Sequence, residues 1–327
     1  MTDGPSGYLA VDSGGSGLRV AVGVPGGPPS AHGESKEPVR TGARGIDPGH
    51  LLEQLLPLAR ALSVQAGLPR LDTAVVGAAG FATLGDGLRA ELPDALAREL
   101  GVRTVALAAD AVTAYVGALG LGPGAVVAAG TGLIALGTDL VRWRRADGWG
   151  HLLGDCGSGA WIGRAGLEAA LRARDGRDGG SASLLAHAEE AFGPMPGLPG
   201  RLYPRSDRAA ALASFAPRVA SCAAADPVAA GILRTAARHI AESAAAVCPA
   251  EGEPRIALTG GLFRMGDPLL TPLEEELTAR LPYARRVPAE GDPLHGSVRI
   301  AAALAAGSLG LPGDDERMLQ VVGVARN

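Results

Sequence analysis

The chain has 327 residues and a net charge of −4, so it carries no surplus of positive charge to attract nucleic acid or an acidic membrane surface. Hydrophobic residues make up 47% of the sequence but aromatic residues only 3%, so its cores must be built mainly from alanine, valine and leucine. The length predicts two domains. No segment approaches the roughly 20 apolar residues that span a bilayer, and the beginning of the sequence lacks a basic and apolar leader. We therefore expect a cytoplasmic protein without a nucleic-acid or membrane partner.

The three cysteines, Cys156, Cys222 and Cys248, lie far apart in the sequence and are odd in number. This spacing supports neither a disulfide framework nor a paired-cysteine zinc site. It is typical of a protein kept in a reducing compartment, which adds to the expectation of a cytoplasmic location.

The first predicted element is a β-hairpin. Residues 8–11 and 18–24 are apolar enough to form two strands, and the turn between them, residues 12–17, reads Asp-Ser-Gly-Gly-Ser-Gly. Glycine N–H groups and the hydroxyl of Ser16 can donate to phosphate oxygens, and Asp12 can hold Mg²⁺ through water. The alternative interpretation is an ordinary hairpin with a glycine-rich tip.

A loop, a helix, a strand and a second helix are expected next. Residues 25–37 are rich in proline, glycine and serine and predict the loop. The Asp47-Pro48 pair predicts a helix start, because aspartate caps the first turn and proline fits its first position. Pro57 should kink or divide that helix. A strand and turn over 72–80 and an amphipathic helix over 88–100 follow.

Asp110 directly follows a strand predicted over residues 102–109 and opens a helix predicted over 111–119. An acid at the carboxyl end of an inner strand faces the edge at which open α/β sheets bind ligands. Asp110 can therefore serve as a catalytic residue, and it can also cap the helix that follows. The two roles are compatible.

A second hairpin repeats the design of the first. Strands are predicted over residues 125–129 and 133–138, and Gly130-Thr131-Gly132 forms the turn between them. Two hairpins with phosphate-type turns, more than a hundred residues apart, predict two related half-folds. We expect a nucleotide to be held in the cleft between them.

Residues 148–163, called here the glycine–tryptophan segment, read Gly-Trp-Gly-His-Leu-Leu-Gly-Asp-Cys-Gly-Ser-Gly-Ala-Trp-Ile-Gly. Glycine lets the backbone approach a ligand closely. Aromatic rings beside glycines and the carboxylate of Asp155 suggest a site for a polar, ring-shaped ligand. The alternative is a tight turn followed by a helix that packs on Trp161.

The remainder of the chain alternates helices with short strands. A strand over 255–258 runs into Thr259-Gly260-Gly261, where adjacent glycines permit close approach to a flat base or ribose. Residues 193–207 contain prolines and glycines and predict an exposed loop or lid. Residues 284–287 predict a short edge strand. Helices are predicted over 158–173, 181–192, 209–223, 226–247, 269–281 and 292–306.

In this order, the motifs resemble those of the actin/hexokinase/Hsp70 ATPase superfamily. Residues 12–16 look like its first phosphate motif, residues 130–132 like its second, and residues 259–261 like its adenosine motif. The glycine–tryptophan segment is similar to the sugar-site signature of N-acetylglucosamine kinases, which belong to the BadF/BadG/BcrA/BcrD-type ATPase group. The resemblance covers residues 7–306.

The resemblance implies an α/β fold of two ribonuclease-H-like (actin-like ATPase) domains, with a nucleotide- and sugar-binding cleft between them. One domain would comprise residues 1–118, with a C-terminal helix, 296–327, packing back on it. The other would comprise residues 119–295. The family also implies a homodimer.

The implied activity is transfer of a phosphoryl group from ATP, with Mg²⁺, to the 6-hydroxyl of an amino sugar such as N-acetylglucosamine. A kinase for glucosamine or another hexose, an ATPase that activates another enzyme and a sugar sensor are the alternatives. Asp110 matches the family's catalytic acid, and Asp12 would hold the metal through water. Its amino-sugar contacts match Gly148, Trp149, Gly150 and Asp155, and its ATP contacts match Asp12, Gly14, Gly15, Ser16, Thr131, Gly132, Gly260 and Gly261.

Three positions depart from the family pattern. Residues 40–47 contain no Asn, which leaves recognition of the N-acetyl group or of particular hydroxyls open. Cys156 stands where a Glu usually follows the signature Asp. The basic residue usual after the first phosphate motif is replaced by Gly17, although Arg19 is nearby.

Overall fold

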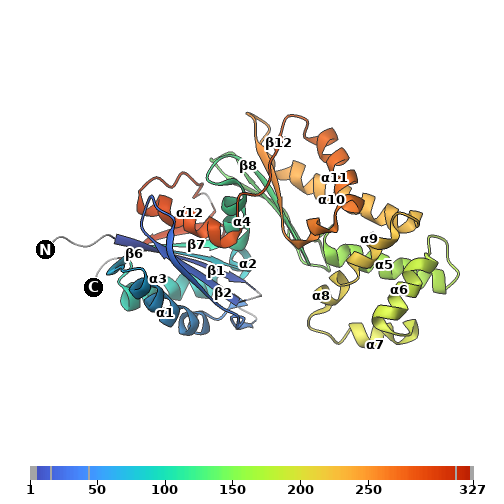
Figure 1. Ribbon diagram of the computed structural model, residues 1–327, viewed down its shortest axis with the longest axis horizontal. Helices are drawn as coiled ribbons and strands as arrows, with labels where there is room; N and C mark the ends of the chain where they lie inside the picture. The colour runs from blue at the N-terminus through green and yellow to red at the C-terminus, as the bar shows by residue number, and fades with distance from the viewer. Residues whose placement is uncertain (1–5, 15–16, 43–44, 314, 325–327) are drawn as a thin grey trace. The chain divides into compact units, whose positions relative to one another are not determined.

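The computed structural model describes residues 6–14, 17–42, 45–313 and 315–324 (Figure 1). Contacts group the chain into two compact units. The first contains Met1–Gly124, Gly137–Trp143 and Pro288–Asn327, and the second contains Ala125–Leu136 and Arg144–Val287. The boundaries at residues 118 and 295 stay predictions of where independently folding domains would divide.

The first unit contains a six-stranded sheet in the order β13-β7-β6-β1-β2-β3. Strands β1, β6 and β7 run parallel, whereas β2, β3 and β13 are antiparallel to their neighbours. A separate two-stranded ribbon pairs Thr41–Gly42 (β4) with Gly45–Ile46 (β5). The strands of the large sheet are β1 Ser6–Gly14, β2 Gly17–Gly23, β3 Pro29–Ser35, β6 Arg70–Ala78, β7 Thr104–Ala109 and β13 Leu319–Gly323.

Helices cover both faces of this sheet (Figure 1). Helices α1 and α3 pack together against one face, and α4 and α12 pack together against the other. The predicted caps are present, since the Asp47 carboxylate accepts N–H bonds at the start of α1 and the Asp292 carboxylate at the start of α12. The helices are α1 Pro48–Gln65, α2 Phe81–Leu84, α3 Asp86–Leu100, α4 Asp110–Leu119 and α12 Pro293–Ala305.

Helices α4 and α12 cross at two glycines. A Cβ on Gly117 would lie 2.1 Å from the carbonyl oxygen of Asp292, and a Cβ on Gly296 would lie 1.9 Å from that of Thr113. Larger residues would therefore separate the helices. The close crossing holds Asp292, at the start of α12, against Gly117 of α4.

A five-stranded sheet in the order β10-β9-β8-β11-β12 lies mostly in the second unit, although the first residue of β8, the last two of β9 and the first of β10 are grouped with the first unit. The strands of this sheet are β8 Gly124–Ala129, β9 Leu133–Thr138, β10 Trp143–Asp147, β11 Arg255–Thr259 and β12 Arg285–Arg286. The helical segments of the second unit are α5 Gly159–Arg174, α6 Ala182–Phe192, η1 Met195–Gly197, α7 Leu198–Leu202, α8 Arg208–Ala213, α9 Ala216–Cys222, α10 Pro227–Val247, η2 Gly261–Met265 and α11 Asp267–Arg280.

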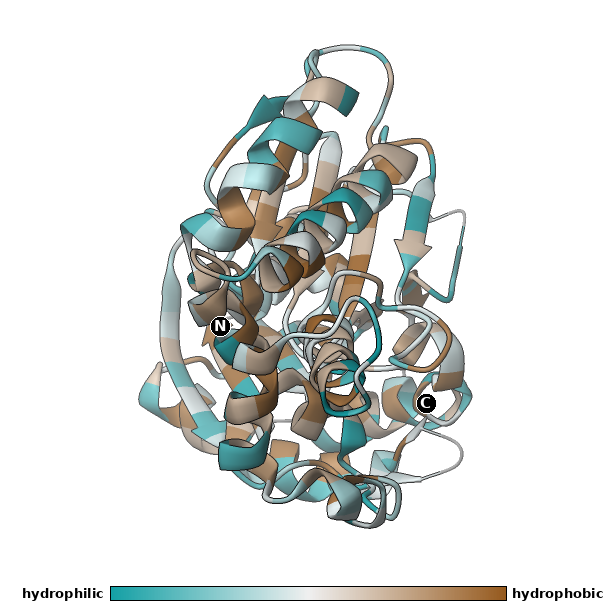
Figure 2. Ribbon diagram, turned by 90° about the vertical axis from the view of Figure 1, so that its right-hand side faces the viewer, coloured by the Kyte–Doolittle hydropathy of each residue, from teal (hydrophilic) through white to brown (hydrophobic). Residues whose placement is uncertain are grey.

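Small aliphatic side chains build the core of the second unit, as the composition predicts. Among the described residues, Phe215 is the aromatic member of a buried cluster that otherwise consists of alanine, valine, leucine, isoleucine, methionine and cysteine. The helices alternate hydrophilic and hydrophobic stretches along their length (Figure 2), as expected for helices that bury one face. No helix in the described part of the chain is both long enough and apolar enough to cross a bilayer.

Two segments predicted as loops contain regular structure. The predicted loop 25–37 contains β3, whose side chains are mostly exposed apart from the buried Ala31. An exposed edge strand needs no alternating apolar pattern, so its sequence resembles a loop. The predicted loop or lid 193–207 contains η1 and α7, which bury Met195 and Leu198 in the core.

Three helix predictions also need correction. Helix α1 continues through the exposed Pro57, so Pro57 does not divide it, and a kink there stays a prediction. The helix predicted over 209–223 is divided into α8 and α9, between which Phe215 is fully buried. The C-terminal helix expected over 296–327 ends at Ala305, and β13 follows it because residues 319–323 pair with β7.

Candidate functional site

The first glycine turn follows a strand that ends at the same edge of the sheet as β6 and β7. Asp12 is opposite Gly77 of β6, and Gly77 is opposite Ala108 of β7. Gly14 ends β1, and a Cβ added to it would meet no atom within 4 Å. Gly15 and Ser16, two of the predicted phosphate contacts, lie outside the described residues.

Asp12 is held by an arginine that the sequence analysis noted only in passing. The Arg19 Nη2 lies 2.5 Å from Oδ2 of Asp12, and its Nη1 lies 2.5 Å from Oδ2 of Asp292. Burial raises the pKa of the Asp12 carboxyl, an effect that Arg19 opposes and that the negative charge of Asp292 reinforces. Arg19 therefore links strands β1 and β2 to the start of α12.

Asp12 also meets the chemical requirement for the predicted magnesium contact. Mg²⁺ in nucleotide sites is commonly held by one or two carboxylates, by phosphate oxygens and by water. The hydrogen bonds from Arg19 reach one carboxylate oxygen of Asp12, Oδ2, so Oδ1 is the oxygen suited to hold a metal-bound water. The described residues contain no group of three or more His, Cys, Asp and Glu side chains that could hold a metal on their own.

Asp110 begins α4 at the carboxyl end of β7. Its backbone follows Ala109, which is in register with Ala78 of β6, and Ala78 is in register with Ser13 of β1. Asp110 is exposed, and its Oδ1 accepts the N–H of Ala111 at 2.9 Å. The N-cap of α4 is Ala109, so the alternative role of Asp110 as N-cap is not the one observed. Asp12 and Asp110 thus lie at the same edge of one sheet.

The second glycine turn is bound to the start of α5. The N–H of Gly159 donates to the Gly130 carbonyl at 2.8 Å, and the N–H of Ala160 donates to the Thr131 carbonyl at 3.0 Å. Ser158 caps the helix, as its hydroxyl accepts the N–H of Trp161. The turn and the glycine–tryptophan segment therefore form one connected structure.

Asp155 joins these two parts through its side chain. Its Oδ1 accepts the N–H of Gly150 at 3.1 Å, and a Cβ added to Gly132 would lie 2.8 Å from its Oδ2. Asp155 is only 9% exposed. Burial raises the pKa of its carboxyl and the charge of Asp147 raises it further, while the N–H groups of Gly150 and Leu133 act in the opposite direction.

Two residues of β10 support the glycine–tryptophan segment, although no sequence motif singled them out. Both oxygens of Asp147 accept backbone N–H groups, from Asp155 at 2.6 Å and from Cys156 at 2.8 Å. Arg145 donates to the carbonyls of Asp147 and Gly148, and its guanidinium lies 4.8 Å from the centre of the Trp149 ring. These contacts fix the backbone at the start of the glycine–tryptophan segment and at Asp155 and Cys156.

The other residues of the segment differ widely in burial. Trp149 is 66% exposed, and Leu152 and Leu153 are more exposed still. Burial raises the pKa of the Cys156 thiol, which opposes formation of a nucleophilic thiolate. Trp161 is partly buried and its ring meets that of His239 edge to face, so the alternative prediction of a helix packed on Trp161 also describes part of the segment.

A pocket of about 490 Å³ lies in the second unit where two predicted nucleotide motifs meet. Gly130 and Thr131 of the second glycine turn and Gly261 of the predicted adenosine motif share its wall. Gly260, at φ 104°, lets η2 start close to β8, because a Cβ there would lie 2.2 Å from the Ala129 carbonyl oxygen. The rest of the lining was not among the predicted nucleotide contacts and consists of Gly159, Ala213, Ala216, Pro217, Leu262, Arg264 and Met265.

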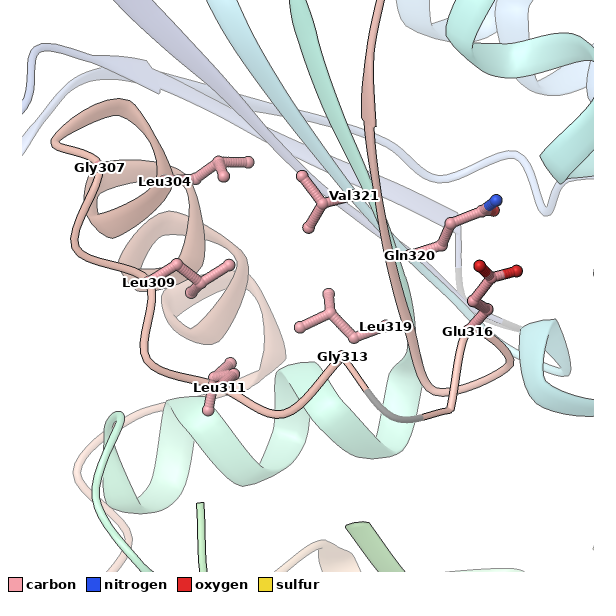
Figure 3. Close-up of a pocket in the computed structure, with 9 residues that line it drawn as sticks. All are labelled: Leu304, Gly307, Leu309, Leu311, Gly313, Glu316, Leu319, Gln320 and Val321. Atoms are coloured by element: carbon pink, nitrogen blue, oxygen red, sulfur yellow. The ribbon is translucent and has the colours of Figure 1, made fainter. Parts of the chain in front are cut away.

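A second pocket, of about 450 Å³, lies in the first unit between the end of α12 and β13. Figure 3 shows Leu304, Leu309 and Val321 pointing into it, whereas the side-chain ends of Gln320 and Glu316 lie on the other side of the strand. None of the residues that line this pocket is among the predicted site residues.

The fold is a mixed α/β fold with two helix-flanked sheets, the architecture of actin-like ATPases and sugar kinases. The sequence pattern of the BadF/BadG/BcrA/BcrD ATPase family matches residues 11–296. The chain therefore belongs to this family, which confirms the resemblance seen in the motifs. A comparison with curated protein sequences found no match.

Solved structures similar to this chain include sugar kinases. A candidate N-acetylglucosamine kinase from Chromobacterium violaceum has 28% identity and a TM-score of 0.65, over 90% of this chain and 98% of that one. A candidate N-acetylglucosamine kinase from Porphyromonas gingivalis has 16% identity and a TM-score of 0.61, over 89% and 97%. A ROK glucokinase from Streptomyces griseus, in complex with glucose and AMPPNP, has 20% identity and a TM-score of 0.51, over 92% and 100%. The last two show similarity of fold alone.

Proposed function

We propose that this protein is an ATP-dependent kinase that phosphorylates an amino sugar, N-acetylglucosamine, at its 6-hydroxyl. One observation carries the proposal, namely the contact between Asp155 and Gly132. Asp155 belongs to the segment that resembles a sugar site, and Gly132 belongs to the turn that lines the pocket where the nucleotide motifs meet. A sugar held by Asp155 would therefore lie next to the phosphates of a bound nucleotide.

The pocket at η2 supports binding of ATP. Its apolar side chains suit a flat base, and the hydroxyl of Thr131 in the second glycine turn suits a phosphate oxygen. Arg264 supplies a positive charge at the pocket wall. Asp12 would hold Mg²⁺ through water, and the metal would supply neutralising charge for the phosphates. On this proposal Gly14, Gly15 and Ser16 contact phosphate as well.

The sugar would be bound by the glycine–tryptophan segment. The carboxylate of Asp155 would accept hydroxyl protons in charge-assisted hydrogen bonds, and the backbone at Gly148 and Gly150 would approach the ring. Trp149 would contact one side of the sugar. Residues 40–47 lack the family's Asn, so glucosamine and other hexoses are the substrates to test beside N-acetylglucosamine.

Asp110 would be the catalytic base. Phosphoryl transfer depends mostly on positioning and on stabilisation of charge. An exposed carboxylate at the carboxyl end of β7 could accept the proton of the attacking hydroxyl and orient its oxygen. In this proposal the oxygen of the sugar 6-hydroxyl forms a bond to the γ-phosphorus of ATP while the bond from that phosphorus to the β–γ bridging oxygen breaks. The hydroxyl proton passes to a carboxylate oxygen of Asp110, and ADP leaves.

The product decides between the proposal and its alternatives. We expect sugar-dependent release of ADP, and phosphorus NMR of the product with N-acetylglucosamine should show phosphate on the oxygen of C6. Phosphate on C1 would contradict the proposed position. ATP hydrolysis that no sugar stimulates would favour an ATPase activator, and sugar binding without turnover would favour a sensor. We also propose that the protein is cytoplasmic and forms a homodimer. Light scattering of the purified protein tests the oligomeric state.

A further inference from the structure

Asp147, the last residue of β10, has an unusual backbone conformation. Its φ is 60°, a left-handed value that few residues other than glycine adopt. Aspartate tolerates this region better than most residues, because its short side chain can bond to nearby backbone. An observed left-handed aspartate therefore raises the question of what its carboxylate binds.

The carboxylate of Asp147 binds the far end of the loop that it begins. Oδ1 accepts the N–H of Asp155 at 2.6 Å, and Oδ2 accepts the N–H of Cys156 at 2.8 Å. Asp155 is itself left-handed, at φ 53°. Residues 147–155 thus form a closed loop with a left-handed aspartate at each end.

The same carboxylate leaves no room for a side chain at Gly154. A Cβ on Gly154 would lie 2.5 Å from Oδ1 of Asp147 and 2.9 Å from Cβ of Trp149. The glycine before Asp155 is therefore required by the Asp147 side chain as well as by the loop. Asp147, Gly154 and Asp155 fit together as one unit.

The orientation of Asp155 depends on this arrangement. Its backbone N–H is bound by Asp147, and its own carboxylate reaches Gly150 inside the loop and lies against Gly132 outside it. A loop released from Asp147 would lose the bonds that fix the backbone at Asp155 and Cys156, and would keep those from the N–H groups of Gly150 and Leu133 to the Asp155 carboxylate. Charge-assisted bonds of this kind are among the stronger ones in proteins.

We propose that Asp147 is a positioning residue, whose carboxylate fixes the loop 147–155 so that Asp155 is presented to the sugar. This inference rests on the proposed function, since it assigns Asp147 a part in binding the sugar. It extends the predicted sugar-binding set, which does not include Asp147.

Three substitutions separate the carboxylate from the backbone conformation. Asp147→Gly accepts a φ of 60° without strain but removes both acceptors, Asp147→Ala removes both acceptors and keeps the strain, and Asp147→Asn keeps one acceptor oxygen. We expect the Gly and Ala variants to raise the KM for the sugar about tenfold or more, with the KM for ATP changed less than about threefold. The Asn variant should fall between them and the wild type.

Hydrogen exchange gives a readout that does not depend on activity. In the Gly and Ala variants the amides of Asp155 and Cys156 should lose protection about tenfold or more, because their acceptor is gone. Asp139→Ala is the matched control. The Asp139 side chain also accepts two backbone N–H groups, those of Val141 and Arg142, but outside the glycine–tryptophan segment. That variant should leave the sugar KM and the Asp155 amide unchanged.

A Gly variant with wild-type sugar KM and wild-type protection at Asp155 and Cys156 would overturn the inference, because only the backbone conformation would then matter. If the Ala variant does not fold, the Gly variant still decides. If the wild type phosphorylates no sugar, the proposed function fails, and the exchange of these two amides still shows whether Asp147 holds the loop.

Discussion

Asp155 lies directly against Gly132, with its Oδ2 2.8 Å from the point at which a Cβ on Gly132 would stand. This contact joins the glycine–tryptophan segment to the second glycine turn within one unit of the protein. It makes the proposed sugar site and the proposed nucleotide site dependent on each other. Substitution of Gly132 by alanine, which adds a single methyl group, tests that dependence.

Gly132→Ala should impair sugar binding, because the new methyl group must displace the Asp155 carboxylate. We expect the sugar KM to rise by about tenfold or more in steady-state kinetics. Gly130→Ala is the matched control in the same turn, since its Cβ would meet no atom within 4 Å. Equal sugar KM values for the two variants would contradict the role given to the contact.

Substitutions of the adjacent glycines Gly260 and Gly261 should have different effects, one on stability and the other on ATP binding. Gly261 lines the pocket and its Cβ would be in open space, so Gly261→Leu should fill the pocket and raise the KM for ATP, with little change in the KM for sugar. Gly260→Ala would meet the Ala129 carbonyl and should instead lower the melting temperature. Unchanged ATP binding in Gly261→Leu, measured by calorimetry, would remove this pocket from the nucleotide site.

Sugar binding should weaken as the pH falls, because protonation removes the Asp155 carboxylate. This loss should begin at a higher pH than it would for an aspartate with the ordinary pKa. Burial and the neighbouring Asp147 carboxylate raise the pKa of Asp155, so its carboxylate is protonated earlier as the pH falls, while His151 opposes the shift. Asp147→Asn removes the like charge and should move this acid limb to lower pH. A plot of sugar KM against pH checks both statements, and identical limbs in the two proteins would contradict the assignment to Asp155.

Arg19→Met should destabilise the first unit in a pH-dependent way. Asp12 would remain partly buried and charged without its partner, at a cost on the order of 1–2 kcal/mol near pH 7. Because the pKa of Asp12 is already raised by burial and would rise further, acid protonates it and the deficit relative to the wild type shrinks as the pH falls. Asp292, whose pKa is lowered partly by Arg19, changes the deficit in the same direction.

Denaturant unfolding at several pH values measures that deficit. Arg205→Met is the control, because Arg205 pairs with Asp207 on an exposed part of the second unit, where ion pairs contribute little. A deficit for Arg19→Met that stays constant with pH would show that lost packing, and not lost charge, is responsible.

The sequence predicted the parts of the fold that depend on local chemistry. Asp47, Asp226 and Asp292 each begin a helix with proline at its first position, and all three caps are observed. Strand β13 was not predicted, because its pairing with β7 depends on residues more than two hundred positions away. The edge strand β3 was missed because its exposed face carries no apolar repeat.

The candidate site likewise has residues that sequence motifs indicate and residues that only the folded structure brings together. Glycine turns and the glycine–tryptophan segment are visible as motifs, so Asp155, Gly132 and Gly261 could be singled out from the sequence. Ala213 and Met265 line the pocket by virtue of tertiary packing and match no motif. Asp147 was missed because its importance lies in a left-handed backbone and two hydrogen bonds, neither of which leaves a pattern in the sequence.

The most direct test compares wild type and Asp110→Asn in an assay of ADP release with ATP and N-acetylglucosamine, glucosamine and glucose in parallel. The account predicts sugar-dependent ADP release by the wild type, highest with N-acetylglucosamine, and a loss of roughly two orders of magnitude or more in Asp110→Asn with ATP binding retained. ADP release that no sugar stimulates, or near-normal turnover of Asp110→Asn, would contradict it.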